Sequence, residues 1–206
     1  GGTPQARLAH NLVHDPDPDY RRRCLEALFE KWPRAEQTVE AAMSCLGDHE
    51  KTTIRLAAAR GIVALASRPH GSFGTGNEDF RARARSVLKD IAQDPAVVDG
   101  QRADALGALV PQIDDHSEVA RLLGEPLGSS AQARYFPRLA NRVMGLAVSR
   151  KVSLPFDLIT PYLSDADVAG AAAEALEFVV DPRTAPALLR LLENDDEGIA
   201  TKAAIS

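Results

Sequence analysis

Residues Asp165–Asn194 read DADVAGAAAEALEFVVDPRTAPALLRLLEN, and this stretch decides the fold. Small and apolar residues recur at helical spacing on both sides of a single break at Asp181-Pro182. Asp favours a turn or a helix N-cap, and Pro ends the helix that precedes it. The stretch therefore predicts two consecutive helices, Val168–Val180 and Thr184–Glu193, that pack through their apolar faces.

The first half of this unit recurs along the chain. In each copy an apolar or polar residue, often followed by Arg, precedes small or apolar residues four and eight positions further on. The copies are Tyr20-Arg21 with Cys24 and Leu28, Ile54-Arg55 with Ala58 and Ile62, Phe80-Arg81 with Ala84 and Leu88, Gln101-Arg102 with Ala105 and Leu109, Val168-Ala169 with Ala172 and Leu176, and Ile199-Ala200 with Ala203. The spacing from Tyr20 to Ile54 is 34 residues and that from Val168 to Ile199 is 31, as in two-helix repeats, whereas the spacing from Ile54 through Phe80 to Gln101 is shorter and uneven.

The remaining helices follow from the same periodicity and from Pro, Gly and Asp breaks. We expect them at Thr3–His14, Tyr20–Trp32, Ala35–Leu46, Glu50–Ser67, Asp79–Gln93, Val98–Ile113, Ala131–Ser149 and Leu154–Leu163. The pattern weakens in two irregular insertions, near 68–78 and near 114–130. The second is expected to hold one short helix, Val119–Leu123, followed by the loop Gly124–Gly128. We interpret residues 1–206 as a single repeat array, excised from a longer protein.

The unit Asp165–Asn194 resembles a HEAT repeat, and is most similar to the short repeats of phycobilisome-lyase-like HEAT proteins. In that pattern an Asp precedes a Val-Arg pair, Ala or Gly fills the seam, and a turn leads into an Ala-Leu-Leu helix. Asp48–Leu65 is similar and keeps the Arg as Arg55. The resemblance implies an all-α, right-handed α-α superhelix of the HEAT/armadillo-like solenoid class, with about five helical pairs. It implies no particular function, because such repeats serve scaffolds, adaptors and a few enzymes.

Charge and cysteine usage narrow the class of protein. The net charge of −5 gives no general attraction to nucleic-acid phosphates. No stretch is long and apolar enough to predict a membrane span. The two cysteines, Cys24 and Cys45, lie on the apolar stripes of expected helices, which favours buried free thiols in a reducing, cytoplasmic environment. A disulfide between these two helices is the alternative.

The repeated arginines have two interpretations. They could form a basic stripe that binds phosphates, or a ladder of Asp–Arg contacts between successive repeats. The acids interleave with the arginines and would cancel a positive field, so we favour the ladder. Its expected members are Arg21, Arg55, Arg81 and Arg102, with Asp19, Asp48 and Asp79 near the helix starts.

The sequence holds weak signals for metal or catalytic chemistry. His10 and His14 are spaced as a zinc-ligand pair, but the intervening residues lack the Glu of a metalloprotease helix. His49-Glu50 is one dyad, whereas the iron-dependent deoxyhypusine hydroxylases, which are built on similar HEAT repeats, carry several. HEAT-like DNA glycosylases need a basic, aromatic-lined cleft, and Trp32 is the only tryptophan. We therefore predict no catalytic, cofactor or metal residue.

We expect a non-catalytic scaffold or adaptor that presents a concave helical surface, lined by the second helix of each pair, to a protein partner. The candidate contact residues are Gln37, Glu40, Ser44, Asp157, Thr160, Arg183 and Arg190. The loop Pro69–Asn77 is a second candidate. One alternative is a regulatory or sensor repeat segment that acts on other domains of its parent chain. The other is a HEAT-like nucleic-acid-binding module or DNA glycosylase-like enzyme.

Overall fold

The computed structural model describes residues 2–33, 35–66, 77–128, 137–192, 200, 201, 203 and 204. All regular secondary structure in these ranges is helical, which confirms the predicted all-α class. The chain divides into two compact units, Gly1–Gln112 and Ile113–Ser206. Among the described helices, none combines the length and the hydropathy that crossing a bilayer requires.

The helices of the first unit begin where the sequence provides caps. The Thr3 hydroxyl accepts a hydrogen bond from the backbone N–H of Ala6 at 3.2 Å. The Asp17 carboxylate accepts one from the backbone N–H of Asp19 at 2.9 Å. Each cap precedes a proline in the first turn, where the missing N–H carries no cost. The elements are α1 (Pro4–His14), α2 (Pro18–Lys31), α3 (Glu36–Ser44), α4 (Thr52–Ala66), α5 (Asn77–Gln93), α6 (Asp99–Leu109) and the 3-10 helix η1 (Val110–Gln112).

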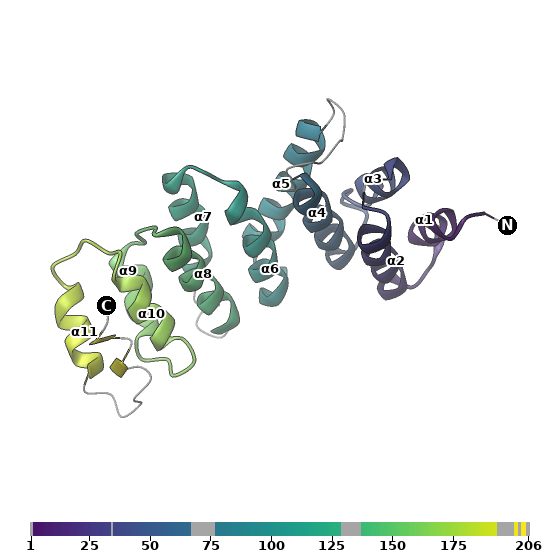
Figure 1. Ribbon diagram of the computed structural model, residues 1–206. Helices are drawn as coiled ribbons and strands as arrows, with labels where there is room; N and C mark the ends of the chain where they lie inside the picture. The colour runs from purple at the N-terminus through teal and green to yellow at the C-terminus, as the bar shows by residue number, and fades with distance from the viewer. Residues whose placement is uncertain are drawn as a thin grey trace. The chain divides into compact units, whose positions relative to one another are not determined.

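In the first unit, helices pack both on their chain neighbours and on the next helix but one. The neighbour pairs include α1 with α2, α4 with α5, and α5 with α6 (Figure 1). The alternate contacts join α2 with α4, α4 with α6, and α1 with α3. Such contacts arise when antiparallel helical pairs stack one after another. They support the solenoid class within this unit.

The second unit contains α7 (His116–Gly128), α8 (Pro137–Arg150), α9 (Phe156–Ile159), the 3-10 helix η3 (Thr160–Tyr162), α10 (Ala169–Leu176) and α11 (Thr184–Leu192). Here too α8 contacts α10 and α7 contacts α9. The last helix, α11, is anchored by Leu191, which packs with Ala169, Ala173 and Ala203 in a buried cluster.

The small residues of the repeated phrase form the interhelical seams. The residues four positions into the phrase are at most 2% exposed at Cys24, Ala58, Ala84, Ala105 and Ala172, and 6% exposed at Ala203. The residues at the eighth position are buried as well: Leu28, Ile62, Leu88, Leu109 and Leu176. Small side chains let helix backbones approach closely, which explains their recurrence.

One expected loop is helical instead. Gly124–Gly128 was predicted as a loop after a short helix, but α7 runs unbroken through it, so most of the irregular segment near 114–130 is regular. The two glycines lie one turn apart and face α9. A Cβ atom would stand 3.4 Å from Leu158 at Gly124 and 3.7 Å from it at Gly128. Both separations are ordinary van der Waals distances, so the packing against α9 does not require glycine at either position. Pro126 between them is accommodated within the helix.

Smaller differences concern element ends. The expected helix Leu154–Leu163 is the short α9 followed by η3, and α10 ends at Leu176 rather than at Val180. Leu192, expected to point inward, is 42% exposed. Pro137 begins α8, as a proline in a first turn can. The glycine-rich insertion and the candidate loop Pro69–Asn77 lie outside the described residues, apart from Asn77, the first residue of α5.

Candidate binding pocket in the second unit

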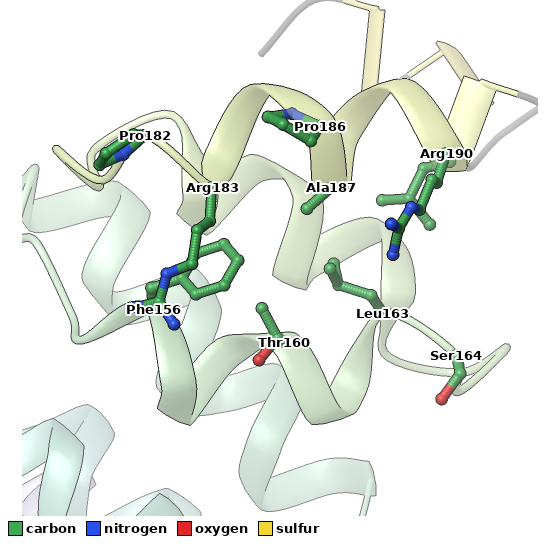
Figure 2. Close-up of a pocket in the computed structure, with 10 residues that line it drawn as sticks. Phe156, Thr160, Leu163, Ser164, Pro182, Arg183, Pro186, Ala187 and Arg190 are labelled. Carbon is green, nitrogen blue, oxygen red and sulfur yellow. The ribbon is translucent and has the colours of Figure 1, made fainter.

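A pocket of about 690 Å³ lies between α9–η3 and α11. Its walls come only from the second unit. The lining residues are Phe156, Thr160, Leu163, Ser164, Pro182, Arg183, Pro186, Ala187, Arg190 and Leu191 (Figure 2). The volume falls within the range of sites that hold a small ligand or a few side chains of a partner.

The pocket surface is mainly apolar and rests on the core. Leu191 is buried in the cluster that joins α11 to α10, and Leu163 packs against the same cluster. Pro182 and Pro186 lie on the opposite wall and restrict the backbone at the start of α11. A cavity with a packed floor and a proline-stiffened wall is largely preformed, which lowers the entropy cost of binding.

Arg183 closes one end of the pocket in a fixed position. Its guanidinium donates hydrogen bonds to Asp157 Oδ1 at 2.8 Å and to Asp181 Oδ2 at 2.8 Å. Its central carbon lies 4.4 Å from the centroid of the Phe156 ring, a cation–π contact. Side-chain and backbone hydrogen bonds from Arg183 lower the pKa of Asp181 to about 2. Two carboxylates thus balance the charge of Arg183.

Arg190 lies at the other end of the pocket, beside Leu163 (Figure 2). It lies within α11, whereas Arg183 lies in the turn immediately before the helix begins at Thr184. Its side chain is exposed. Within the described part of the chain, no carboxylate forms an ion pair with it. The two arginines of the pocket therefore differ, because Arg183 is paired with two carboxylates whereas no carboxylate of the described residues pairs with Arg190.

The sequence candidates from the second unit converge on this pocket. Thr160, Arg183 and Arg190 line it, and Asp157 holds Arg183. The sequence reasoning missed Phe156, Leu163 and the two prolines, since it selected only polar residues of the second helices.

The other candidates belong to the first unit. Gln37, Glu40 and Ser44 are exposed on one face of α3, opposite the buried Val39 and Ala42. The Ser44 hydroxyl donates to the backbone carbonyl of Ala41 at 2.8 Å. The three side chains are accessible to a partner, as the sequence predicted, and their role in binding stays a prediction.

The repeated arginines all bind carboxylates, although the partners differ from those expected. Arg55 pairs with Asp48 at 2.8 Å, as predicted. Arg21 pairs with Glu50, and Arg81 with Glu78 at 3.6 Å, so Asp19 and Asp79 were wrong as their partners. Glu78 lies one turn before Arg81 on α5, so this pair lies within one helix and does not link successive repeats as the predicted ladder would. Arg102 pairs with Asp99 of its own helix at 3.4 Å.

Several of these arginines also bind the carbonyl ends of neighbouring helices. Arg21 donates to the Leu12 carbonyl in the last turn of α1, and Arg102 Nε donates to the Ala92 carbonyl near the end of α5 at 3.1 Å. Arg85 donates to the Gln112 carbonyl at 2.9 Å. The last carbonyls of a helix lack partners within it, and a cation there also complements the helix dipole. These arginines therefore join successive helices.

The other chemical candidates have simple structural surroundings. The rings of His10 and His14 are adjacent, with their centroids 4.4 Å apart. Over the described ranges, no group of three His, Cys, Asp or Glu residues is placed to hold a metal ion. Cys24 and Cys45 are free and buried, as the favoured interpretation predicted. Burial raises the pKa of both thiols.

Comparison with solved structures finds weak likenesses, and one of them is to an engineered protein. An engineered protein with a crystal structure from the Northeast Structural Genomics Consortium aligns with 98% of this chain and 67% of its own, at 16% identity and a TM-score of 0.42. A likeness at that score carries no argument about fold or function. No protein-family model and no curated protein matches the chain.

Proposed function

We propose that this chain is a HEAT-like helical-repeat module that binds a protein partner and does not itself catalyse a reaction. The stacking of alternate helices supports the repeat architecture, because α2, α4 and α6 contact in series within the first unit. The burial of the repeated small residues at the seams supports it too. A right-handed superhelix of about five pairs is part of this proposal.

The pocket beside α11 is the observation that carries the binding role. It combines a packed apolar floor, a stacked Arg183–Phe156 pair and the exposed Arg190, which has no ion-pair partner among the described residues. Apolar anchors and a few fixed polar groups are what a peptide side chain needs for recognition. The arginines of the first unit contribute to helix contacts and ion pairs, so they leave little for phosphate binding.

The test is a selection of random peptides displayed on phage against the immobilised chain 1–206. Two variants serve as counter-targets. Ala187→Phe fills the pocket, because Ala187 lines it. Ala185→Phe makes the same change at an exposed position of α11 that does not line the pocket.

We expect peptide families that bind the wild-type chain and Ala185→Phe but are lost on Ala187→Phe. Circular dichroism of the two variants checks that both retain the wild-type helix content. A selection that enriches no family on the wild-type chain would contradict the proposed function. Peptide families that bind Ala187→Phe equally well would show that the peptides bind the chain outside this pocket.

A further inference from the structure

The two ends of the pocket differ in what they offer a ligand, although each end carries an arginine. The guanidinium of Arg183 is engaged by both Asp157 and Asp181, and its face lies on the Phe156 ring. A ligand carboxylate at that end would compete with two protein carboxylates already in place. Arg183 therefore offers a ligand a flat surface and no free charge.

The Arg190 end of the pocket differs from the Arg183 end in its ion pairing. Arg190 lies on α11 beside the apolar Leu163, and among the described residues no carboxylate pairs with it. An arginine without a partner is an open donor for a bidentate carboxylate contact. Charge complementarity thus assigns the acidic group of a ligand to the Arg190 end.

The space between the two ends is suited to apolar side chains. Leu163, Ala187 and Leu191 line it, and Phe156 forms its far end. A ligand with an acidic group at Arg190 and an apolar part over these residues would pair with the guanidinium of Arg190. It would also cover the exposed apolar surface.

We propose that the pocket binds an extended peptide segment that carries one acidic side chain next to apolar side chains. The carboxylate contacts Arg190, and the apolar residues lie over Leu163 and Ala187 toward Phe156. This inference rests on the proposed function and specifies its ligand. Arg190 is the residue that determines specificity, and Arg183 positions Phe156 and shapes the wall.

The probes are defined peptides, acetyl-Gly-Glu-(Ala)n-Leu-Phe-Gly-amide, with a spacer of up to three alanines. Each has a twin in which Gln replaces Glu. Binding to the full chain is measured by isothermal titration calorimetry or by NMR shift changes. We expect at least one spacer length to bind, with a preference for Glu over Gln of about three- to tenfold, as a partly exposed ion pair gives. The preference should shrink as salt is added.

Three variants separate the roles of the arginines. Arg190→Gln should bring the Glu/Gln preference close to one. Arg183→Gln should weaken the Glu and Gln peptides by the same factor, because it removes the wall and leaves the acid contact intact. Arg142→Gln is the matched control, since Arg142 is an exposed arginine of α8 that does not line the pocket. It should leave affinity and preference unchanged.

Several results would overturn this assignment. They are no binding at any spacer length, equal binding of Glu and Gln twins, or a preference that survives in Arg190→Gln. Displacement of the peptides by 4-phenylbutyrate at equal concentration would show that a free small acid suffices and would reject the peptide as the ligand. Loss of the Glu preference alone refutes only the acidic specificity. An empty phage selection refutes the proposed function itself.

Discussion

Gly61 of α4 lies against the ring of Phe29 of α2, so closely that a Cβ atom at position 61 would stand 2.0 Å from Phe29 Cε2. This contact belongs to the α2–α4 packing that stacks successive helical pairs. The glycine lies in mid-helix, where it is intrinsically unfavourable relative to alanine. Its presence is therefore explained by the space that the phenyl ring occupies.

We expect Gly61→Ala to destabilise the first unit by up to about 2 kcal/mol. Overpacking costs about 1–3 kcal/mol, and the better helix propensity of alanine returns about 1 kcal/mol. In a Phe29→Ala background the same substitution should become neutral or stabilising. Urea unfolding followed by the fluorescence of Trp32, the only tryptophan, measures this double-mutant cycle.

Gly100→Ala is the control for that cycle, because no atom lies within 4 Å of a Cβ at Gly100. It should be neutral or slightly stabilising. Equal effects of Gly61→Ala with and without the Phe29 ring would show that the ring does not require the glycine.

The ion pair of Arg102 and Asp99 is the least exposed in the described part of the first unit, with side chains only 6% and 9% exposed. We expect Arg102→Ala to cost about 3 kcal/mol, because it strands a buried carboxylate and removes the donor to the Ala92 carbonyl. Arg60→Ala, which breaks the exposed Arg60–Asp104 pair, should change stability by less than about 0.5 kcal/mol. Similar losses in urea unfolding for both variants would refute the distinction.

Asp99 also predicts a pH dependence. Burial raises its pKa in the folded chain, and Arg102 only partly offsets this. A carboxyl whose pKa is higher when folded favours folding most at low pH, and this contribution is lost as pH rises from 3.8 through the folded-state pKa. The stability of the wild type relative to Asp99→Asn should therefore be greater at pH 4 than at pH 7. Urea unfolding at both values measures this, and the opposite trend would show that Arg102 outweighs burial.

The pKa of Asp181 shifts in the opposite direction from that of Asp99. Because Arg183 donates hydrogen bonds to its carboxylate, its pKa should be about 2 in a carboxyl-carbon NMR titration. Arg183→Gln should return the pKa of Asp181 toward 3.8. The stabilising effect of the pair is complete above pH 3.8 and is lost as pH falls toward 2. A pKa that does not change in Arg183→Gln would mean that the contact does not persist in solution.

The two thiols should be protected in the native chain. Cys24 and Cys45 are at most 2% exposed, and burial raises the pKa of each. Their reaction with 5,5′-dithiobis(2-nitrobenzoate) at pH 8 should be much slower than that of the urea-unfolded chain. Its rate should rise with urea in parallel with the unfolding seen by Trp32 fluorescence. Reaction of either thiol at the unfolded rate in native buffer would contradict its burial.

The helices and their seams could be predicted because their signals are local. Proline and Thr or Asp caps mark the starts of α1 and α2, and the spacing of Cys24 and Leu28 marks the buried face. These features depend on residues within two turns of each other. The glycines of α7 misled the prediction, because a glycine tolerated within a helix and one that makes a loop look the same in sequence.

By itself the sequence determined an all-α chain with small residues at recurring seams, because helical periodicity is a property of neighbouring residues. Only the tertiary structure decided that Arg183 is paired with carboxylates and that Arg190 has no such partner among the described residues. The Asp157–Arg183 pair joins residues of different helices, and the apolar floor joins Leu163 to Leu191. Such contacts depend on how helices distant in the chain pack, and local periodicity carries no information about them.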